Sequence, residues 1–235
     1  MIWYCTFRIA QPTSHESFSA LHLVSLECWE NSTILQEWMQ SHNMTKTVEV
    51  LQYFEMNLIR YVLNVSRKRP IVWQDLFDMG VKGIPSTVIF DVWKNWIMEG
   101  SVFATTAANY DILFSACWYL DHLNENWWSF YTCNPRNMPN LTSIQQDHIL
   151  GGHSSMWGEN VDSTNFYERV WPRSSATAEV LWSGSPKYIA TELSFDHVQI
   201  RLNRFRCYML EHFAVPISPI SPGHCQAHGP LFMMQ

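Results

Sequence analysis

Two short stretches of the sequence place an aromatic ring two residues before a carboxylate. Tyr119 precedes Asp121 in CWYLD, and Trp157 precedes Glu159 in MWGE. An aromatic face can pack on the C–H face of a pyranose ring, and a carboxylate accepts hydrogen bonds from hydroxyl groups. These pairs therefore indicate a sugar-binding cleft. Taken singly, each residue is as well explained by a buried ring or a solvated loop carboxylate.

Tryptophan supports the same interpretation. The chain contains 12 Trp among 235 residues, and several stand beside acidic or aromatic residues at the ends of apolar runs. Trp73 precedes Asp75, and Trp93 closes the run FDVW. A single Trp is more often part of a core, but this repeated placement favours the walls of a cleft.

The elements that must position these residues alternate along the chain. Four apolar runs are expected to form buried parallel strands, over residues 70–77, 86–93, 111–121 and the beginning of 148–159. Apolar residues recur at helical spacing over 50–62, in part over 165–182, and over 198–209. This alternation predicts the α/β class. The aromatic and acidic residues stand at the carboxyl ends of the strands, where a (β/α)₈ barrel builds its active site.

Composition excludes several other classes of protein. Apolar residues make up 47% of the chain and charged residues 15%, which is typical of a folded domain rather than a disordered one. The net charge of -6 and the lack of a basic run argue against nucleic acid as a partner. No apolar stretch reaches the length of a membrane span, and the first residues lack the pattern of a signal peptide.

Two features nevertheless indicate the secretory route. Asn-x-Ser/Thr acceptors for N-glycosylation occur at Asn31, Asn43, Asn64 and Asn140. Among six cysteines, Cys207 and Cys225 flank a proline-rich loop, so we expect a disulfide that ties down the tail. Six reduced thiols remain the alternative.

The stretch GGHSSMWGENVDSTNFYERVWPRSSATAEVLWS, residues 151–183, is similar to the closing segment of the glycoside hydrolase family 20 β-N-acetylhexosaminidases. It differs at His153, where the family has Glu, and at Val180, where the family has Arg. The stretches ECWENSTILQEWM, IVWQDLFD, FDVW and SACWYLD match the same family in order.

The resemblance implies the C-terminal half of a (β/α)₈ barrel: four parallel strands with helices, then a C-terminal helix and tail. The implied organisation is an unmatched segment 1–20, a partial catalytic domain 21–213 and a tail 214–235. Half a barrel leaves open strand edges, so we expect the chain to pair with a second copy or another subunit, as a homo- or heterodimer. Lysosomal or secreted localisation is implied by the family.

The resemblance also implies roles for the cleft residues. In this family the acetamido oxygen of the substrate attacks the anomeric carbon, without metal or cofactor, on glycans ending in N-acetylhexosamine. Trp73, Trp93 and Trp157 would wall in the acetamido group, and Tyr119 would bind its oxygen. Asp121 and Glu159 would accept hydrogen bonds from the outer hydroxyls, and Asp75 would support the site.

The catalytic pair of the family is missing from its expected place. The family motif His-x-Gly-Gly-Asp-Glu, followed by Val and then Cys-Trp, corresponds here to ALHLVSLECW, from Ala20 to Trp29. Four residues, the Asp-Glu pair among them, are absent between Leu23 and Val24. We therefore expect no catalytic residues and no hydrolysis by this chain alone. The alternative to an enzyme is a non-catalytic carbohydrate-binding or subunit-like protein.

Overall fold

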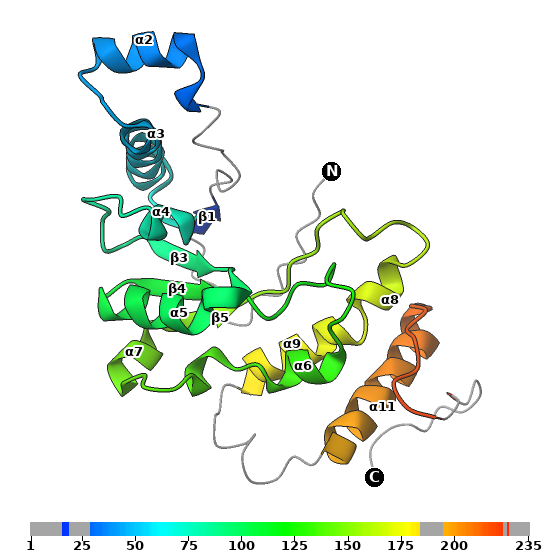
Figure 1. Cartoon of the computed structure of the whole chain (residues 1–235). Helices are drawn as coiled ribbons and strands as arrows, with labels where there is room; N and C mark the ends of the chain where they lie inside the picture. The colour runs from blue at the N-terminus through cyan, green and yellow to red at the C-terminus, as the bar shows by residue number, and fades with distance from the viewer. Residues whose placement is uncertain (1–15, 19–28, 184–194, 223–224, 226–235) are drawn as a thin grey trace. The chain divides into compact units, whose positions relative to one another are not determined.

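The computed structural model describes residues 16–18, 29–183, 195–222 and 225 (Figure 1). These residues fall into two compact units, which we treat separately. The sheet unit comprises residues 16–18, 29–114 and 139–150, and the helical unit comprises 115–138, 151–183, 195–222 and 225. Residues 19–28, which contain all but the last residue of the stretch ALHLVSLECW, and Cys5 lie outside the described residues.

The sheet unit is built on five strands in sequential order, β1-β2-β3-β4-β5. They are β1 (Glu16–Phe18), β2 (Arg69–Trp73), β3 (Ile89–Val92), β4 (Asp111–Phe114) and β5 (Ile149–Gly152). The last two residues of β5 are counted with the helical unit. The first three neighbouring pairs are parallel, with Val72 opposite Phe90 and Phe90 opposite Ile112. Every residue of β3 is buried, as expected for a parallel strand covered on both faces. The α/β class and the partial barrel are confirmed.

The strands differ from the predicted runs at their ends. The run 111–121 is a strand only as far as Phe114, and the run 70–77 only as far as Trp73. After β2 the chain turns at once into α4 (Asp75–Asp78), because the Gln74 carbonyl accepts from the backbone N–H groups of Phe77 and Asp78, each at 2.9 Å. Strand β1 was not predicted.

The sheet unit also contains several helices, of which α3 follows the sequence prediction. The predicted helix over 50–62 is α3 (Thr47–Tyr61), which buries Val50, Leu51 and Ile59. It begins where the Glu49 carboxylate accepts from the backbone N–H groups of Thr45 and Lys46, at 2.7 and 2.9 Å, a side-chain cap for a helix start. The other helical elements are α2 (Thr33–Ser41), η1 (Val62–Ser66), η2 (Asn95–Ile97), α5 (Met98–Ala107) and α7 (Ser143–Asp147).

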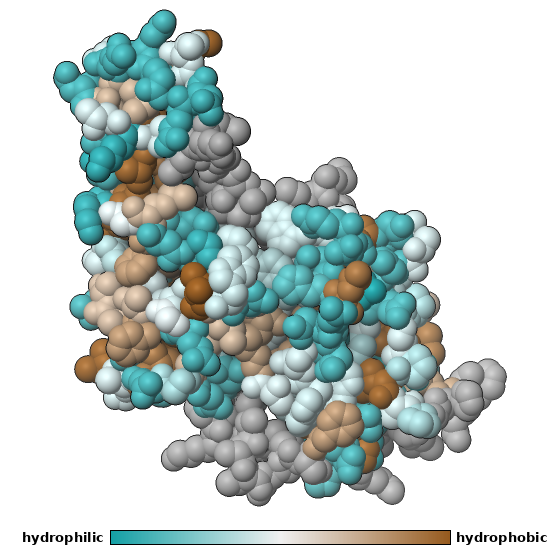
Figure 2. Space-filling view, in the orientation of Figure 1, coloured by the Kyte–Doolittle hydropathy of each residue, from teal (hydrophilic) through white to brown (hydrophobic). Residues whose placement is uncertain are grey.

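The surface of α2 is polar. Figure 2 shows hydrophilic side chains over most of this helix, at the top of the view. Helix α5 packs instead on β3 and β4 and buries Val102, Thr105 and Thr106. The two helices therefore have different surroundings: α2 faces solvent, and α5 covers the sheet.

The helical unit contains α6 (Trp127–Thr132), η3 (Pro135–Asn137), α8 (Phe166–Val170), α9 (Arg173–Ser183) and α11 (Phe195–Phe213). The segment 165–182 is helical in part, as predicted, because Pro172 separates α8 from α9: proline has no N–H to continue a helix. The predicted helix over 198–209 is part of α11, which buries Val198 and Leu202, one turn apart. No helix among the described residues has the length and apolarity to cross a membrane.

Two disulfides belong to the helical unit. The expected bond between Cys207 and Cys225 is present, and Arg206 of α11 also binds the carbonyl of Ile217, at 2.9 Å. A second disulfide, which the sequence analysis did not predict, joins Cys117 in the loop after β4 to Cys133 at the end of α6. Both bonds fix an irregular segment to a helix.

Candidate functional site

In the sheet unit, two tryptophans lie at the carboxyl ends of neighbouring strands. Trp73 ends β2 and is 4% exposed, and Trp93 directly follows β3 and is half-buried. Trp73 is the register partner of Asp91, and side chains alternate between faces along a strand. Trp93, two residues beyond Asp91, follows directly after β3 at the same end of the sheet as Trp73.

A cluster of charged residues fixes the Trp93 ring. The indole Nε1 donates to Oδ2 of Asp75 at 2.8 Å. Lys94 Nζ in turn bridges Asp75 Oδ1, at 2.9 Å, and Asp78 Oδ2, at 2.6 Å. Burial lowers the pKa of Lys94, but its hydrogen bonds to Asp78 and Asp75 outweigh burial, so the pKa lies above its ordinary value. Asp75 thus orients the Trp93 ring and supports the site through that ring.

The backbone at Trp93 is held by the fully buried amide of Gln74. Its Oε1 accepts from the N–H groups of Trp93 and Lys94, both at 2.9 Å. Its Nε2 donates to Ser101 Oγ at 2.9 Å and to Asp78 at 3.1 Å. Because every polar atom of this amide is used, the turn after β3 has a single well-defined geometry.

In the helical unit, the segments that carry Tyr119 and Trp157 are paired. Leu120 N donates to Ser155 O at 2.7 Å, and Ser155 N donates to Trp118 O at 3.0 Å. Tyr119 and Ser155 form an isolated parallel bridge. The two stretches in which an aromatic residue precedes a carboxylate therefore lie side by side, through main-chain hydrogen bonds.

The side chains of these segments differ in exposure. Tyr119 and Asp121 are each 7% exposed, whereas Trp157 is half-buried and Glu159 is exposed. Asp121 Oδ1 accepts from Trp157 N at 3.4 Å, at the long end of hydrogen bonding. The Tyr119 ring stacks on His122, with centroids 5.1 Å apart.

Burial is the main influence on the pKa of Asp121. It raises the pKa of this carboxyl, and the nearby Glu159 charge raises it further. Backbone N–H groups and His122 act in the opposite direction but do not compensate. A partly desolvated carboxyl with an aromatic neighbour can bind a hydroxyl group of a ligand. The helical unit therefore brings Tyr119, Asp121 and Trp157 together, with Glu159 at the adjoining surface.

The comparison with known families decides the identity of the fold. The model of the "Glycosyl hydrolase family 20, catalytic domain" matches residues 23–185. The chain belongs to glycosyl hydrolase family 20.

Similar proteins support this assignment. Over 204 residues the chain is 33% identical to β-hexosaminidase subunit beta of Felis catus, covering 86% of this chain and 37% of the relative. Over 215 residues it is 34% identical to β-hexosaminidase subunit alpha of Rattus norvegicus, covering 88% and 39%. The solved chitobiase of Flavobacterium johnsoniae superposes with a TM-score of 0.66 and 25% identity, covering 80% of this chain and 28% of that one. The chain thus spans little more than a third of the length of the curated relatives.

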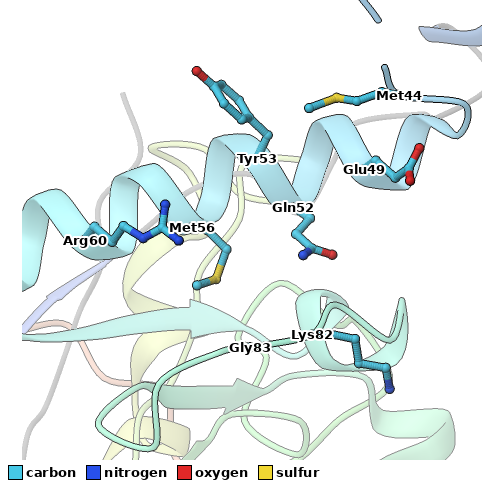
Figure 3. Close-up of a pocket in the computed structure, with 8 residues that line it drawn as sticks. All are labelled: Met44, Glu49, Gln52, Tyr53, Met56, Arg60, Lys82 and Gly83. Atoms are coloured by element: carbon cyan, nitrogen blue, oxygen red, sulfur yellow. The ribbon is translucent and has the colours of Figure 1, made fainter. Parts of the chain in front are cut away.

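A cavity among the described residues of the sheet unit is formed by residues other than the expected family 20 residues. It has a volume of about 490 Å³ and is lined by Met44, Glu49, Gln52, Tyr53, Met56, Arg60, Lys82 and Gly83. Figure 3 shows Gln52 and Met56 pointing from α3 toward the loop that carries Lys82 and Gly83. Its lining is mostly polar and contains none of the residues to which the family resemblance assigns sugar contacts. Among the described residues, no group of His, Cys, Asp or Glu could hold a metal ion.

Sequence reasoning missed two residues that hold the family 20 segments in place. Gln74 fixes the turn at Trp93, and Arg173 binds the loop that follows Tyr119. A glutamine directly after a buried strand and an arginine directly after Trp-Pro were visible signals. Neither reveals its partners, because these are carbonyl or amide groups of distant residues.

Proposed function

We propose that this chain binds the terminal N-acetylhexosamine of a glycan and does not hydrolyse the glycosidic bond. The observation that carries the proposal is the pairing of residues 118–120 with Ser155, which places the Tyr119–Asp121 segment beside Trp157. The names of the relatives, β-hexosaminidase subunits, support the choice of sugar.

Each residue has a proposed task. The Trp157 face packs on the sugar ring, and Tyr119 donates to the acetamido oxygen. Asp121 and Glu159 accept hydrogen bonds from outer hydroxyls. In the sheet unit, Trp73 and Trp93 stand at positions that the family resemblance assigns to aromatic walls, and we propose that role for each ring within its own unit. The supporting observation is that Asp75 and Gln74 hold Trp93 in one orientation.

The proposed lack of hydrolysis rests on the sequence ALHLVSLECW. A general acid must come within hydrogen-bond reach of the leaving oxygen. With four residues absent between Leu23 and Val24, this chain supplies neither that acid nor the aspartate that would orient the acetamido nitrogen. Binding without bond cleavage is the remaining activity of such a site.

Association and localisation are proposed from the names of the relatives, the disulfides and the glycosylation acceptors. The relatives are named as subunits, which supports a homo- or heterodimer. Two disulfides and four surface-exposed asparagines in glycosylation acceptors, Asn31, Asn43, Asn64 and Asn140, support a lysosomal or secreted protein.

Calorimetric titration of the purified chain with methyl β-N-acetylglucosaminide tests the proposal. We expect saturable binding that Glu159→Gln weakens by roughly tenfold, the order expected for a lost charged hydrogen bond. Trp157→Ala should weaken binding as much or more. Glu168→Gln and Trp182→Ala, at other exposed positions of the helical unit, are the matched controls. Absence of binding, or equal losses in variants and controls, would refute the proposal.

A further inference from the structure

Arg173, the first residue of α9, is buried against the loop that follows Tyr119. It is 5% exposed. Its guanidinium donates to the carbonyl oxygens of Leu120, of His122 at 3.0 Å and of Glu125 at 3.4 Å. It also donates to the Arg169 carbonyl, from Nη2 at 2.7 Å and from Nε at 3.1 Å. A single side chain therefore binds three carbonyls of a six-residue loop.

Burying this charge is costly. Burial, and secondarily the neighbouring Arg169, lower the pKa of Arg173 to about 10, which still leaves it charged at neutral pH. Within the described part of the chain no carboxylate forms an ion pair with Arg173, and its hydrogen bonds go to main-chain carbonyls. The Phe130 ring lies 5.3 Å below the guanidinium and adds a cation–π contact. An apolar residue would fill the same space without the desolvation cost. The role of the buried guanidinium is therefore to donate hydrogen bonds to these carbonyl oxygens.

The same loop is fixed from its other side. The N–H of Leu120 donates to Ser155 at 2.7 Å, and the carbonyl of Leu120 accepts from Arg173. The two peptide groups of Leu120, which lies between Tyr119 and Asp121, are thus held between α9 and the segment that leads to Trp157. The position of the Asp121 carboxyl relative to Trp157 depends on both contacts.

We infer that Arg173 is a positioning residue that sets the geometry of Tyr119 and Asp121 for sugar binding through the carbonyls of Leu120 and His122. This inference rests on the proposed function. Arginine is required because its planar fork presents five donors in fixed directions, whereas the single ammonium of lysine cannot meet the carbonyls of Leu120, His122 and Arg169 at once.

The test compares Arg173→Lys with a matched change in the same unit, Arg201→Lys. The Arg201 guanidinium of α11 also makes several hydrogen bonds, to Glu179 at 2.6 Å and to Tyr131 at 3.1 Å, but none to the loop. Three properties are measured for each protein: the affinity for methyl β-N-acetylglucosaminide, the unfolding midpoint and the amide chemical shifts of Leu120 to His122.

We expect Arg173→Lys to weaken sugar binding by about tenfold or more, the effect of displacing binding groups by a fraction of an ångström, and to shift those amide resonances. Arg201→Lys should bind the sugar with unchanged affinity, even if its unfolding midpoint falls as much as that of Arg173→Lys. If Arg173→Lys does not fold, Arg173→Gln, a smaller planar donor, replaces it.

The outcomes separate the two proposals. Normal binding by a folded Arg173 variant, or equal losses of affinity in the Arg173 and Arg201 variants, overturns the positioning role and leaves the proposed function standing. Absence of binding by the native chain overturns the proposed function, and the positioning role with it.

Discussion

At the scale of single residues, Asp121 gives a sign-specific prediction. Its pKa is raised by burial, so the folded chain favours the neutral carboxyl. The stabilising contribution of such a group is fully present below the unfolded pKa, about 3.9, and is lost as the pH rises through the folded pKa. Asp121→Asn keeps an acceptor for Trp157 N. It should therefore raise the free energy of unfolding at neutral pH, with no gain at acidic pH, while weakening sugar binding.

Asp162 is the control of opposite sign. Hydrogen bonds from the Thr164 hydroxyl and backbone lower the pKa of this exposed carboxyl. Its contribution is present above the unfolded pKa and is lost as the pH falls through the folded pKa. Asp162→Asn should reduce stability at neutral pH only. Denaturant unfolding of both variants across acidic to neutral pH checks the pair, and a loss of stability in Asp121→Asn at neutral pH would contradict it.

How far the sequence predicts the site also depends on the single residue. Tyr119, Asp121, Trp157 and Glu159 were identified because their types and spacing suit a sugar. Arg173 was not, because its role consists of contacts to carbonyls 48 to 53 residues away. Carbonyl groups are the same in every residue, so no sequence pattern marks the partners of a buried arginine.

At the scale of the elements, the disulfide between Cys117 and Cys133 gives the next prediction. It closes a loop of 16 residues, for which loop-closure entropy predicts about 3 kcal/mol of stabilisation. The double variant Cys117→Ala/Cys133→Ala should lose that amount in denaturant unfolding. It should also weaken sugar binding, because the loop that begins at Cys117 carries Tyr119.

The double variant Cys207→Ala/Cys225→Ala serves for comparison. It removes a bond of similar span, 18 residues, on α11, and should cost similar stability with sugar affinity unchanged. An unaltered unfolding curve for the Cys117 and Cys133 pair, or equal effects of both pairs on affinity, would contradict the prediction.

The sequence predicted helices better than strand ends. Helix α3 and the buried stripe of α11 follow from the spacing of their apolar residues. The run 111–121 was predicted as one strand because it is continuously apolar, but β4 ends at Phe114. Residues 115–121 form a mostly buried loop that Arg173 and a disulfide hold in place. A buried loop is as apolar in sequence as a buried strand, so the two cannot be told apart by composition.

At the scale of the whole molecule, the exposed glycosylation acceptors give a prediction about its cellular route. Asn31, Asn43, Asn64 and Asn140 are all exposed. Chain produced through a eukaryotic secretory pathway should therefore lose mass on enzymatic removal of N-glycans, and each Asn→Gln change should remove one glycan. Mass spectrometry before and after deglycosylation measures this. An unchanged mass would argue against the secretory route.

The central claim is that this family 20 chain binds sugar without cleaving it. The most direct test is release of a chromogenic leaving group from an aryl β-N-acetylglucosaminide by the native chain, from mildly acidic to neutral pH, with Glu159→Gln beside it. We expect no release above that variant from a folded chain that binds the sugar. Release by the native chain that Glu159→Gln abolishes would contradict it, because a residue of this chain would then be acting as the general acid.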